Sequence, residues 1–139
     1  MKILLEISHP AHVHYFKNFI EIMSNNGYKF QIIAREKDVT FDLLKLNKIS
    51  FINFGKTRNT FIGKALGVFI DDIKLLWYAL NFKPDFYLSF SSPFVGHIAF
   101  VMNKPHIVFD DTEFAKIEHL MYKPFASSIV TPKIFGKDM

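Results

Sequence analysis

Residues 2–34, KILLEISHPAHVHYFKNFIEIMSNNGYKFQIIA, contain the pattern that decides the fold. Residues 2–7 are a short, mostly apolar run, which predicts a buried strand. In residues 12–26 apolar side chains recur at helical spacing from Val13 to Met23, and Gly27 suits the end of that helix. Residues 28–34 return to a short apolar run. A strand, a helix and a second strand in this order predict parallel pairing with a right-handed crossover.

The rest of the chain repeats this alternation. We expect strands at residues 49–54, 85–90, 106–109 and 127–130, and helices at residues 39–47, 61–82, 94–102 and 113–122. Asp38 is the expected N-cap of the helix at 39–47, and residues 55–60 form a polar loop. The sequence therefore predicts an α/β fold, a doubly wound, Rossmann-like parallel sheet of about six strands. The expected strand order is 3-2-1-4-5-6, in a single domain over residues 1–139.

Composition narrows the classes of function. The chain has no cysteine, which excludes disulfide scaffolds and cysteine nucleophiles. Its net charge is +4, but only Arg35 and Arg58 are arginines and the lysines are scattered, so we expect no nucleic-acid partner. The 17 phenylalanines exceed what a core of this size can use. We therefore expect an exposed apolar surface that a second domain or subunit covers, with a homodimer or weak peripheral membrane contact as alternatives.

We expect a cytoplasmic protein, with a position at the inner face of the membrane as the alternative. Only a short apolar run follows Met1 and Lys2, so no signal peptide is recognisable. The longest stretch without charge, residues 86–103, contains three serines, Pro93 and His97, and makes a poor membrane helix.

Chemically active side chains follow the predicted strands. In open parallel sheets ligands bind beyond the carboxyl ends of the strands, near the point where strand order reverses. The segment HPAHVH follows the first strand, but on a helix His12 and His14 point about 200° apart, so we expect no metal site there. His14 is expected to face solvent. His12, in the first helical turn, is a candidate general base, and the alternative is a histidine that merely begins the helix.

Two further motifs lie at the same edge. In FDDTE, Asp110 and Asp111 could orient a histidine or bind a sugar hydroxyl, or could simply cap the next helix. In SSPFVGH, serines at a helix N-terminus could bind an anion or a hydroxyl, with Gly96 allowing close backbone approach. Neither a GxGxxG fingerprint nor a P-loop is present. The pair Asp71 and Asp72 is expected to be structural, on a solvent-facing side of its helix.

Five segments resemble, in order, the N-terminal half of an uncharacterised archaeal and bacterial family. They are EISHPAHVHYFKN (6–18), AREKDVT (34–40), SSPFVGHIAF (91–100), FDDTE (109–113) and VTP (130–132). That family is similar to GT-B glycosyltransferases and UDP-N-acetylglucosamine 2-epimerases. The chain departs from its pattern at Glu6, where aspartate is usual, at Tyr15, where phenylalanine is usual, and at Phe114, where histidine is common.

The resemblance implies a GT-B N-terminal domain, the acceptor side of a two-domain protein. A nucleotide sugar of the UDP type would be the co-substrate, held mostly by a second domain, with no tightly bound cofactor and no metal. AHVH matches the turn at which a histidine deprotonates the acceptor in several GT-B enzymes, and this carries over to His12 alone.

We therefore expect the acceptor-binding half of a glycosyltransferase acting on a sugar or a lipid-linked sugar. His12 is the expected base and Asp110 or Asp111 its orienting carboxylate. A hydrolysing epimerase that uses Glu113 and Asp110 is one alternative, and a non-catalytic binding module is another. The expected substrate-binding residues are Ser8, His9, Arg35, Ser91, Ser92, His97, Thr112 and Glu113.

Overall fold

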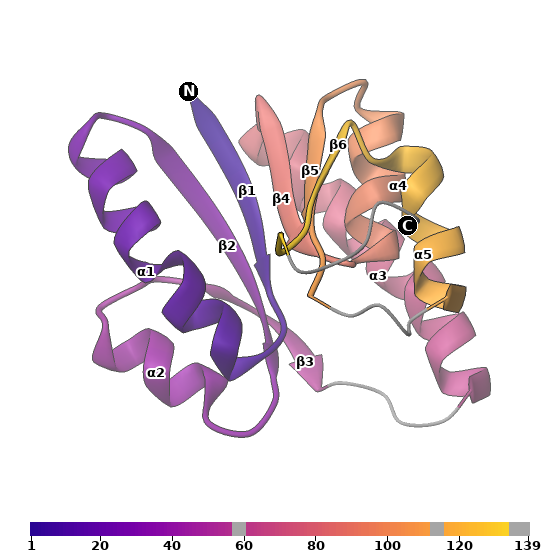
Figure 1. Cartoon of the computed structure of the whole chain (residues 1–139), viewed down its shortest axis with the longest axis horizontal. Coiled ribbons are helices and arrows are strands. Elements are labelled where there is room, and N and C mark those ends of the chain that lie inside the picture. Colours follow the sequence, from indigo (N-terminus) through magenta and orange to yellow (C-terminus); the bar gives the residue numbers. More distant parts are fainter. Residues whose placement is uncertain (57–60, 112–115, 134–139) are drawn as a thin grey trace.

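The computed structural model describes residues 1–56, 61–111 and 116–133, and in this part of the chain six strands form one parallel sheet (Figure 1). The strand order β3-β2-β1-β4-β5-β6 confirms the predicted doubly wound, Rossmann-like topology. Strand order therefore reverses between β1 and β4, where a ligand site is expected. The strands are β1 (Lys2–Ile7), β2 (Lys29–Glu36), β3 (Ile52–Lys56), β4 (Phe86–Phe90), β5 (His106–Phe109) and β6 (Ser128–Val130).

Helices cover both faces of this sheet. Figure 1 shows α1 and α2 on the near side of β1–β3, and α3, α4 and α5 on the far side. The helices are α1 (Pro10–Asn25), α2 (Thr40–Leu46), α3 (Phe61–Phe82), α4 (Pro93–Val101) and α5 (Lys116–Tyr122), followed by a short 3-10 turn, Lys123–Phe125. The described helices leave the near side of β5 and β6 uncovered.

Alternation along β1 divides the core into two layers. Ile3, Leu5 and Ile7 are fully buried against α1 and α2, whereas Leu4 is buried on the opposite face, beneath α3 and α4. Successive side chains of a strand point to opposite faces. Glu6 follows the same alternation and is therefore buried on the α3 side, at the carboxyl end of the strand.

The third strand differs from its prediction. It begins at Ile52 rather than at residue 49, and it includes Gly55 and Lys56, which were expected in a loop. The backbone N–H of Ile49 instead donates to the carbonyl of Leu44 and closes α2. Gly55 has a φ of 85°, near a register shift in the pairing of β2 and β3, so its conformation favours glycine.

The predicted N-cap of α2 is also wrong. Val39 precedes the first helical residue and caps it with no side-chain hydrogen bond, while the hydroxyl of Thr40 donates to the carbonyl of Lys37. Asp38 lies one residue earlier, with a φ of 47°. Asp38 therefore stands one position before the N-cap, the residue whose side chain caps the first turn of a helix.

An apolar surface runs along the outer side of α3. Its members Phe69, Ile70, Ile73, Trp77 and Leu80 are each more than half exposed. The sequence predicted such a surface from the excess of aromatic residues. No described helix is both long and apolar enough to cross a membrane.

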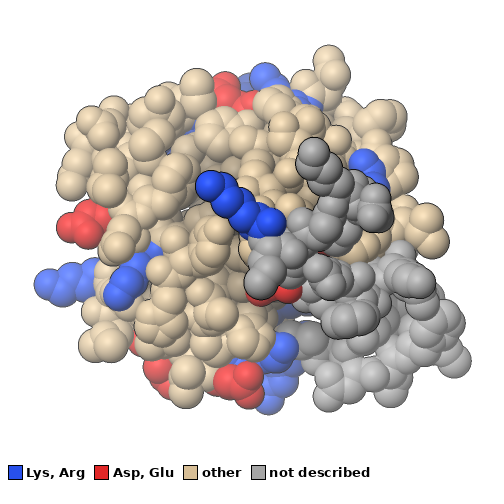
Figure 2. All heavy atoms as spheres, viewed as in Figure 1, with Lys and Arg blue, Asp and Glu red and all other residues tan. Residues whose placement is uncertain are grey.

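A second apolar area lies on the opposite side of the sheet. A groove of about 380 Å³ is lined by aromatic and aliphatic side chains of α1, β4 and β5, among them Tyr15, Phe19, Phe86 and Phe109. Figure 2 shows uncharged residues over much of this side, with a lysine or arginine side chain lying across its middle and other charged side chains nearer its outline. Much of the phenylalanine excess therefore lies beside or within partly open surfaces.

Candidate functional site

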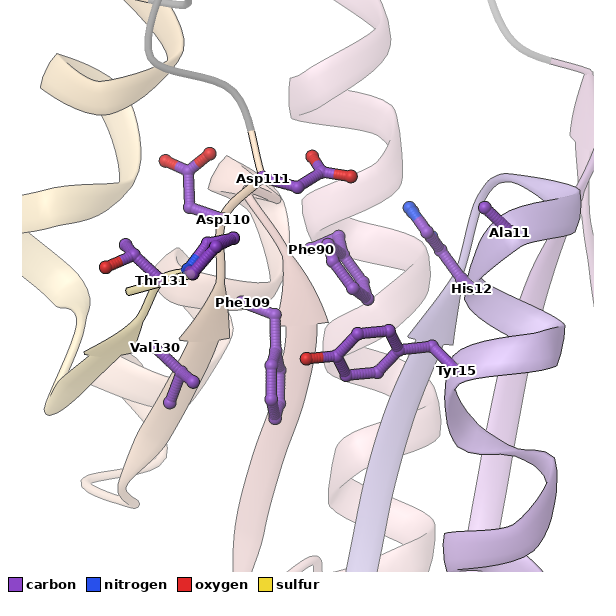
Figure 3. Close-up of a pocket in the computed structure, with 10 residues that line it drawn as sticks. Ala11, His12, Tyr15, Phe90, Phe109, Asp110, Asp111, Val130 and Thr131 are labelled. Atoms are coloured by element: carbon purple, nitrogen blue, oxygen red, sulfur yellow. The ribbon is translucent and has the colours of Figure 1, made fainter. Parts of the chain in front are cut away.

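A pocket of about 200 Å³ opens at the carboxyl edge of the sheet, where strand order reverses (Figure 3). Side chains of α1, β4, β5 and the segment after β6 form it, so the topology brings together residues that are far apart in sequence. Ligand pockets for drug-sized molecules measure about 300–1,000 Å³. This pocket suits a group of sugar size better than a whole nucleotide sugar. Its lining residues are Ala11, His12, Tyr15, Phe90, Phe109, Asp110, Asp111, Val130, Thr131 and Pro132.

His12 stands in the first turn of α1 and forms one wall of the pocket. Its ring stacks on Phe90, with centroids 4.0 Å apart and planes at 11°. The backbone N–H of Ser8 donates to His12 Nδ1 at 3.4 Å, and Ser8 Oγ lies 3.5 Å from the same nitrogen. Burial, with a smaller contribution from His9, lowers the pKa of His12 to about 4. The imidazole is therefore neutral at pH 7 and can accept a proton.

The two adjacent aspartates have different surroundings. Asp111 is exposed at the pocket, and Figure 3 shows its carboxylate and the His12 ring pointing toward one another. The negative charge of Asp111 opposes the lowering of the His12 pKa. Asp110 is 2% exposed and points toward α5, where its Oδ2 lies 2.7 Å from His119 Nε2 and accepts a hydrogen bond from the Tyr122 hydroxyl.

Residues around the start of α1 have local structural contacts. His9 is the N-cap of α1, and its Nδ1 accepts a hydrogen bond from the N–H of Ala11. Pro10 follows at the first helical position, where its missing N–H is harmless. His14 is exposed, as predicted from its face of the helix. Among the described residues no three histidine, aspartate or glutamate side chains are placed to hold a metal ion.

The serine motif after β4 lies at the edge of the sheet, but its residues do not line the pocket. Ser91 has a φ of 44°, and its backbone N–H donates to the carbonyl of Phe109 at 3.1 Å. Ser92 is buried at the N-cap of α4 and makes no capping hydrogen bond. Gly96 does allow a close approach, but to residues of the fold and not to a ligand. A Cβ added at this position would lie 3.1 Å from Phe125 Cβ and 3.3 Å from His106 Nδ1.

Arg35 and His97 lie on the α3 side of the sheet, outside the pocket. Arg35 was expected among the substrate-binding residues at the open edge, but it is 9% exposed and pairs with Asp71 at 2.6 Å. His97 Nδ1 lies 3.0 Å from Asp72 Oδ2. The prediction that Asp71 and Asp72 face solvent is therefore wrong, since Asp71 is buried and both side chains connect α3 to neighbouring elements.

Glu6 belongs to this buried polar cluster and was not among the expected site residues. Burial raises the pKa of Glu6 to about 7, opposed by the nearby Arg35 guanidinium and by a hydrogen bond with the Ser8 side chain. Its Oε2 has no hydrogen-bond partner in the described part of the chain. An acidic residue inside an otherwise apolar strand was the sequence signal that could have identified it.

Sequence reasoning also missed parts of the pocket wall. Tyr15 lies one helical turn after His12, so helical spacing could have placed it beside that histidine. Phe90 ends β4 and could have been expected at the same edge. His119 and Tyr122 could not, because only the tertiary structure brings α5 to Asp110. Thr112 and Glu113 lie outside the described residues.

Comparison with solved structures finds the same fold at low sequence identity. MurG of Acinetobacter baumannii is similar with a TM-score of 0.75 and 14% identity, over 98% of this chain and 43% of that one. The UDP-GlcNAc 2-epimerase of Neisseria meningitidis bound to UDP-GlcNAc gives 0.72 and 16%, over 95% and 40%. The glycosyltransferase SsfS6 of Streptomyces sp. SF2575 gives 0.58 and 16%, over 79% and 39%.

These matches confirm the expected Rossmann-like fold of GT-B N-terminal domains. The chain spans 39–43% of the length of the three structures. No curated protein sequence matches this chain significantly. A family model described as "Protein of unknown function (DUF354)" matches residues 1–138, and the chain therefore belongs to that family.

Proposed function

We propose that this chain is the acceptor-binding half of a sugar-nucleotide-dependent glycosyltransferase, with His12 as the general base. The observation that carries this proposal is the pocket at the strand-order reversal. There a neutral imidazole faces a carboxylate between aromatic walls. The similarity to proteins that include a UDP-GlcNAc-bound epimerase and a glycosyltransferase supports a nucleotide sugar as the co-substrate.

In the proposed step, an acceptor hydroxyl lies in the pocket against His12. The O–H bond breaks as its proton passes to the ring nitrogen, and the oxygen forms a bond to the anomeric carbon of the donor sugar. The bond from that carbon to the nucleoside diphosphate breaks, and the diphosphate leaves with the electron pair. Asp111 stabilises the imidazolium, which offsets the low basicity that burial imposes on His12.

The pocket volume supports an acceptor role more than a donor role. A space of about 200 Å³ can hold one sugar unit next to His12. A second domain would hold most of the UDP-sugar donor, with no tightly bound cofactor. The acceptor is a sugar or a lipid-linked sugar. In this arrangement the Tyr15 and Thr131 hydroxyls and the Asp111 carboxylate are polar groups of the pocket wall that could orient it.

The alternative of a hydrolysing epimerase requires Asp110 and Glu113 to act as acid and base. Asp110 is directed to His119 and Tyr122 rather than to the open pocket, which favours the transferase. The two proposals differ in one measurable product. An epimerase of this kind releases UDP from UDP-GlcNAc without an acceptor, whereas a transferase releases UDP only when an acceptor is present.

Ligand-induced thermal stabilisation tests whether this chain binds the acceptor while a second domain binds the donor. We expect simple glycosides from an acceptor panel to raise the Tm of the chain, and UDP-GlcNAc to raise it little. His12→Ala should weaken the glycoside effect, and His14→Ala, on the exposed side of α1, should preserve it. Strong stabilisation by UDP-GlcNAc with none by any glycoside would contradict the acceptor assignment.

A further inference from the structure

The apolar groove beside α1 is continuous with the candidate pocket. Tyr15 and Phe109 line both spaces, and their rings meet edge to face with centroids 5.5 Å apart. Figure 3 shows these two rings on one side of Phe90, with His12 and Asp111 on the other. A molecule bound beside His12 can therefore extend across Tyr15 and Phe109 into the groove.

Both walls of the groove run away from the pocket, along the strands. On α1 the lining residues recur one helical turn apart on a single face: Tyr15, Phe19 and Met23. On β4 they recur at every second position, again on one face: Phe90 at the pocket, then Leu88 and Phe86 in the groove. Four residues of strand span about 13 Å. The groove is therefore long enough for an extended chain joined to a group in the pocket.

The groove is apolar along its length, whereas the pocket has a polar end. Every described residue that lines the groove is a methionine, tyrosine, phenylalanine, leucine or isoleucine. The pocket adds His12, Asp111 and Thr131. The connected spaces of about 200 and 380 Å³ thus match a hydroxyl-bearing head with a hydrocarbon chain. Further sugar units would lose hydration in the groove without gaining hydrogen-bond partners.

The lining of the groove is accessible in the folded chain. The described helices leave this side of β5 uncovered, and Ile107 and Phe109 on that strand are partly exposed (Figure 1). A contiguous exposed apolar surface of this kind marks a binding site. The apolar stripe of α3 lies on the other side of the sheet and contributes no residue to the pocket. It therefore serves as an internal comparison for non-specific binding of hydrocarbon.

We propose that the groove binds the hydrocarbon chain of the acceptor, which makes the substrate class lipid-linked sugars and not free sugars. The sugar lies in the pocket, and its chain extends past Tyr15 and Phe109 along α1. The position of the sugar beside His12 rests on the proposed function. The affinity of the groove for a hydrocarbon chain is a property of this chain alone and is measurable without a donor.

Binding of methyl, hexyl and octyl β-glucoside to this chain, below their critical micelle concentrations, tests the assignment. Each methylene that leaves water should strengthen binding about fourfold, so octyl glucoside should bind about tenfold more tightly than hexyl glucoside. With isoleucine methyl groups labelled for NMR, octyl glucoside should shift the signal of Ile107 in the groove. The signal of Ile73, in the stripe of α3, should not move.

A lysine in the groove should remove the dependence on chain length. Ile107→Lys places a charge against the bound chain, so octyl and hexyl glucoside should bind equally. Met23→Lys does the same from α1, where Met23 is partly exposed, and keeps the test readable if Ile107→Lys disturbs folding. Ile73→Lys is the matched control, because it makes the same change in an exposed apolar surface outside the groove. It should preserve the tenfold difference, and the two isoleucine variants also assign the methyl signals.

Equal affinity of the wild-type chain for hexyl and octyl glucoside would overturn the proposal. So would a tenfold difference that survives in a folded Ile107→Lys or Met23→Lys chain, or one that Ile73→Lys abolishes. A wild-type dimer that Ile107→Lys converts to a monomer, with no dependence on chain length, would assign the groove to a second copy instead.

Failure of this proposal is distinguishable from failure of the proposed function. If binding depends on chain length as expected but no sugar transfer is ever detected, only the transferase assignment fails. If a protein that contains this chain transfers sugar to methyl and octyl glucoside with equal KM values, only the role of the groove fails.

Discussion

At the scale of single residues, His12 and His14 lie on the same helix but in different environments, so the effects of replacing them can be compared directly. In a two-domain protein that contains this chain, His12→Ala should lower turnover by about 10²–10⁴-fold, the usual contribution of a general base. His14→Ala should change turnover little, because that side chain is exposed. Steady-state rates of both variants check the prediction. Equal losses would point to a shared role of the two histidines.

Substitutions of Asp110 and Asp111 should likewise have different effects, one on stability and the other on the pKa of His12. Asp110→Asn disturbs the buried contacts with His119 and Tyr122 and should lower the free energy of unfolding by about 1–3 kcal/mol. Asp111→Asn is an exposed change and should alter stability by less than about 0.5 kcal/mol. Its effect should instead fall on the pKa of His12, which drops further without the negative charge. Urea unfolding and NMR titration of His12 check the two parts.

At the scale of elements, the ion pair between Arg35 and Asp71 connects β2 to α3. Asp71→Ala leaves a buried guanidinium without this partner, which destabilises a protein by about 3–5 kcal/mol. We expect the lower end of that range, because Glu6 also faces Arg35. The partly exposed contact of Asp72 with His97 is the internal control, and Asp72→Ala should lower stability by less than about 1 kcal/mol. A comparable loss in both variants by urea unfolding would contradict this account.

The outer side of α3 should also promote self-association of the isolated chain. Ile73 and Trp77 are 58% and 62% exposed, within an apolar stripe along the helix. The double variant Ile73→Lys/Trp77→Lys should reduce concentration-dependent association in sedimentation velocity with little change in Tm, because neither side chain is buried. A wild-type chain that remains monomeric at high concentration would show that this surface is tolerated in water.

At the scale of the whole molecule, buried titratable groups set the pH dependence of stability. His12 and His106 have pKa values lowered by burial to about 4, so between about pH 4 and 6.5 the unfolded chain binds protons that the folded chain does not. Stability should therefore rise with pH across that window. Glu6 acts oppositely, because its raised pKa of about 7 makes the folded chain bind the extra proton between about pH 4.5 and 7.

The two histidines outnumber Glu6 below pH 6.5, so the net expectation is a Tm that increases from pH 4.5 to 6.5. Glu6→Met removes the opposing contribution and should steepen that rise. Thermal unfolding monitored by circular dichroism across the range checks both slopes. A Tm that falls between pH 4.5 and 6.5 would show that the buried histidines do not govern acid stability.

The sequence by itself determined the order of elements, the parallel sheet and the edge at which function is expected. These follow from local rules: apolar runs of strand length, helical spacing in α1, and the geometry of strand–helix–strand crossovers. Its errors were also local. Ile49 closes α2 instead of beginning β3, because one apolar residue can serve either element.

Only the tertiary structure decided which polar residues meet. Asp110 and Asp111 are neighbours in sequence, yet one is bound to α5 and the other faces His12, because adjacent residues leaving a strand point in different directions. Arg35, expected at an open edge, is neutralised by Asp71 inside the fold, since a buried charge requires a partner that the sequence does not identify. The same physics places Glu6 beside Arg35 and Asp71, where local sequence shows only one acidic residue in an apolar strand.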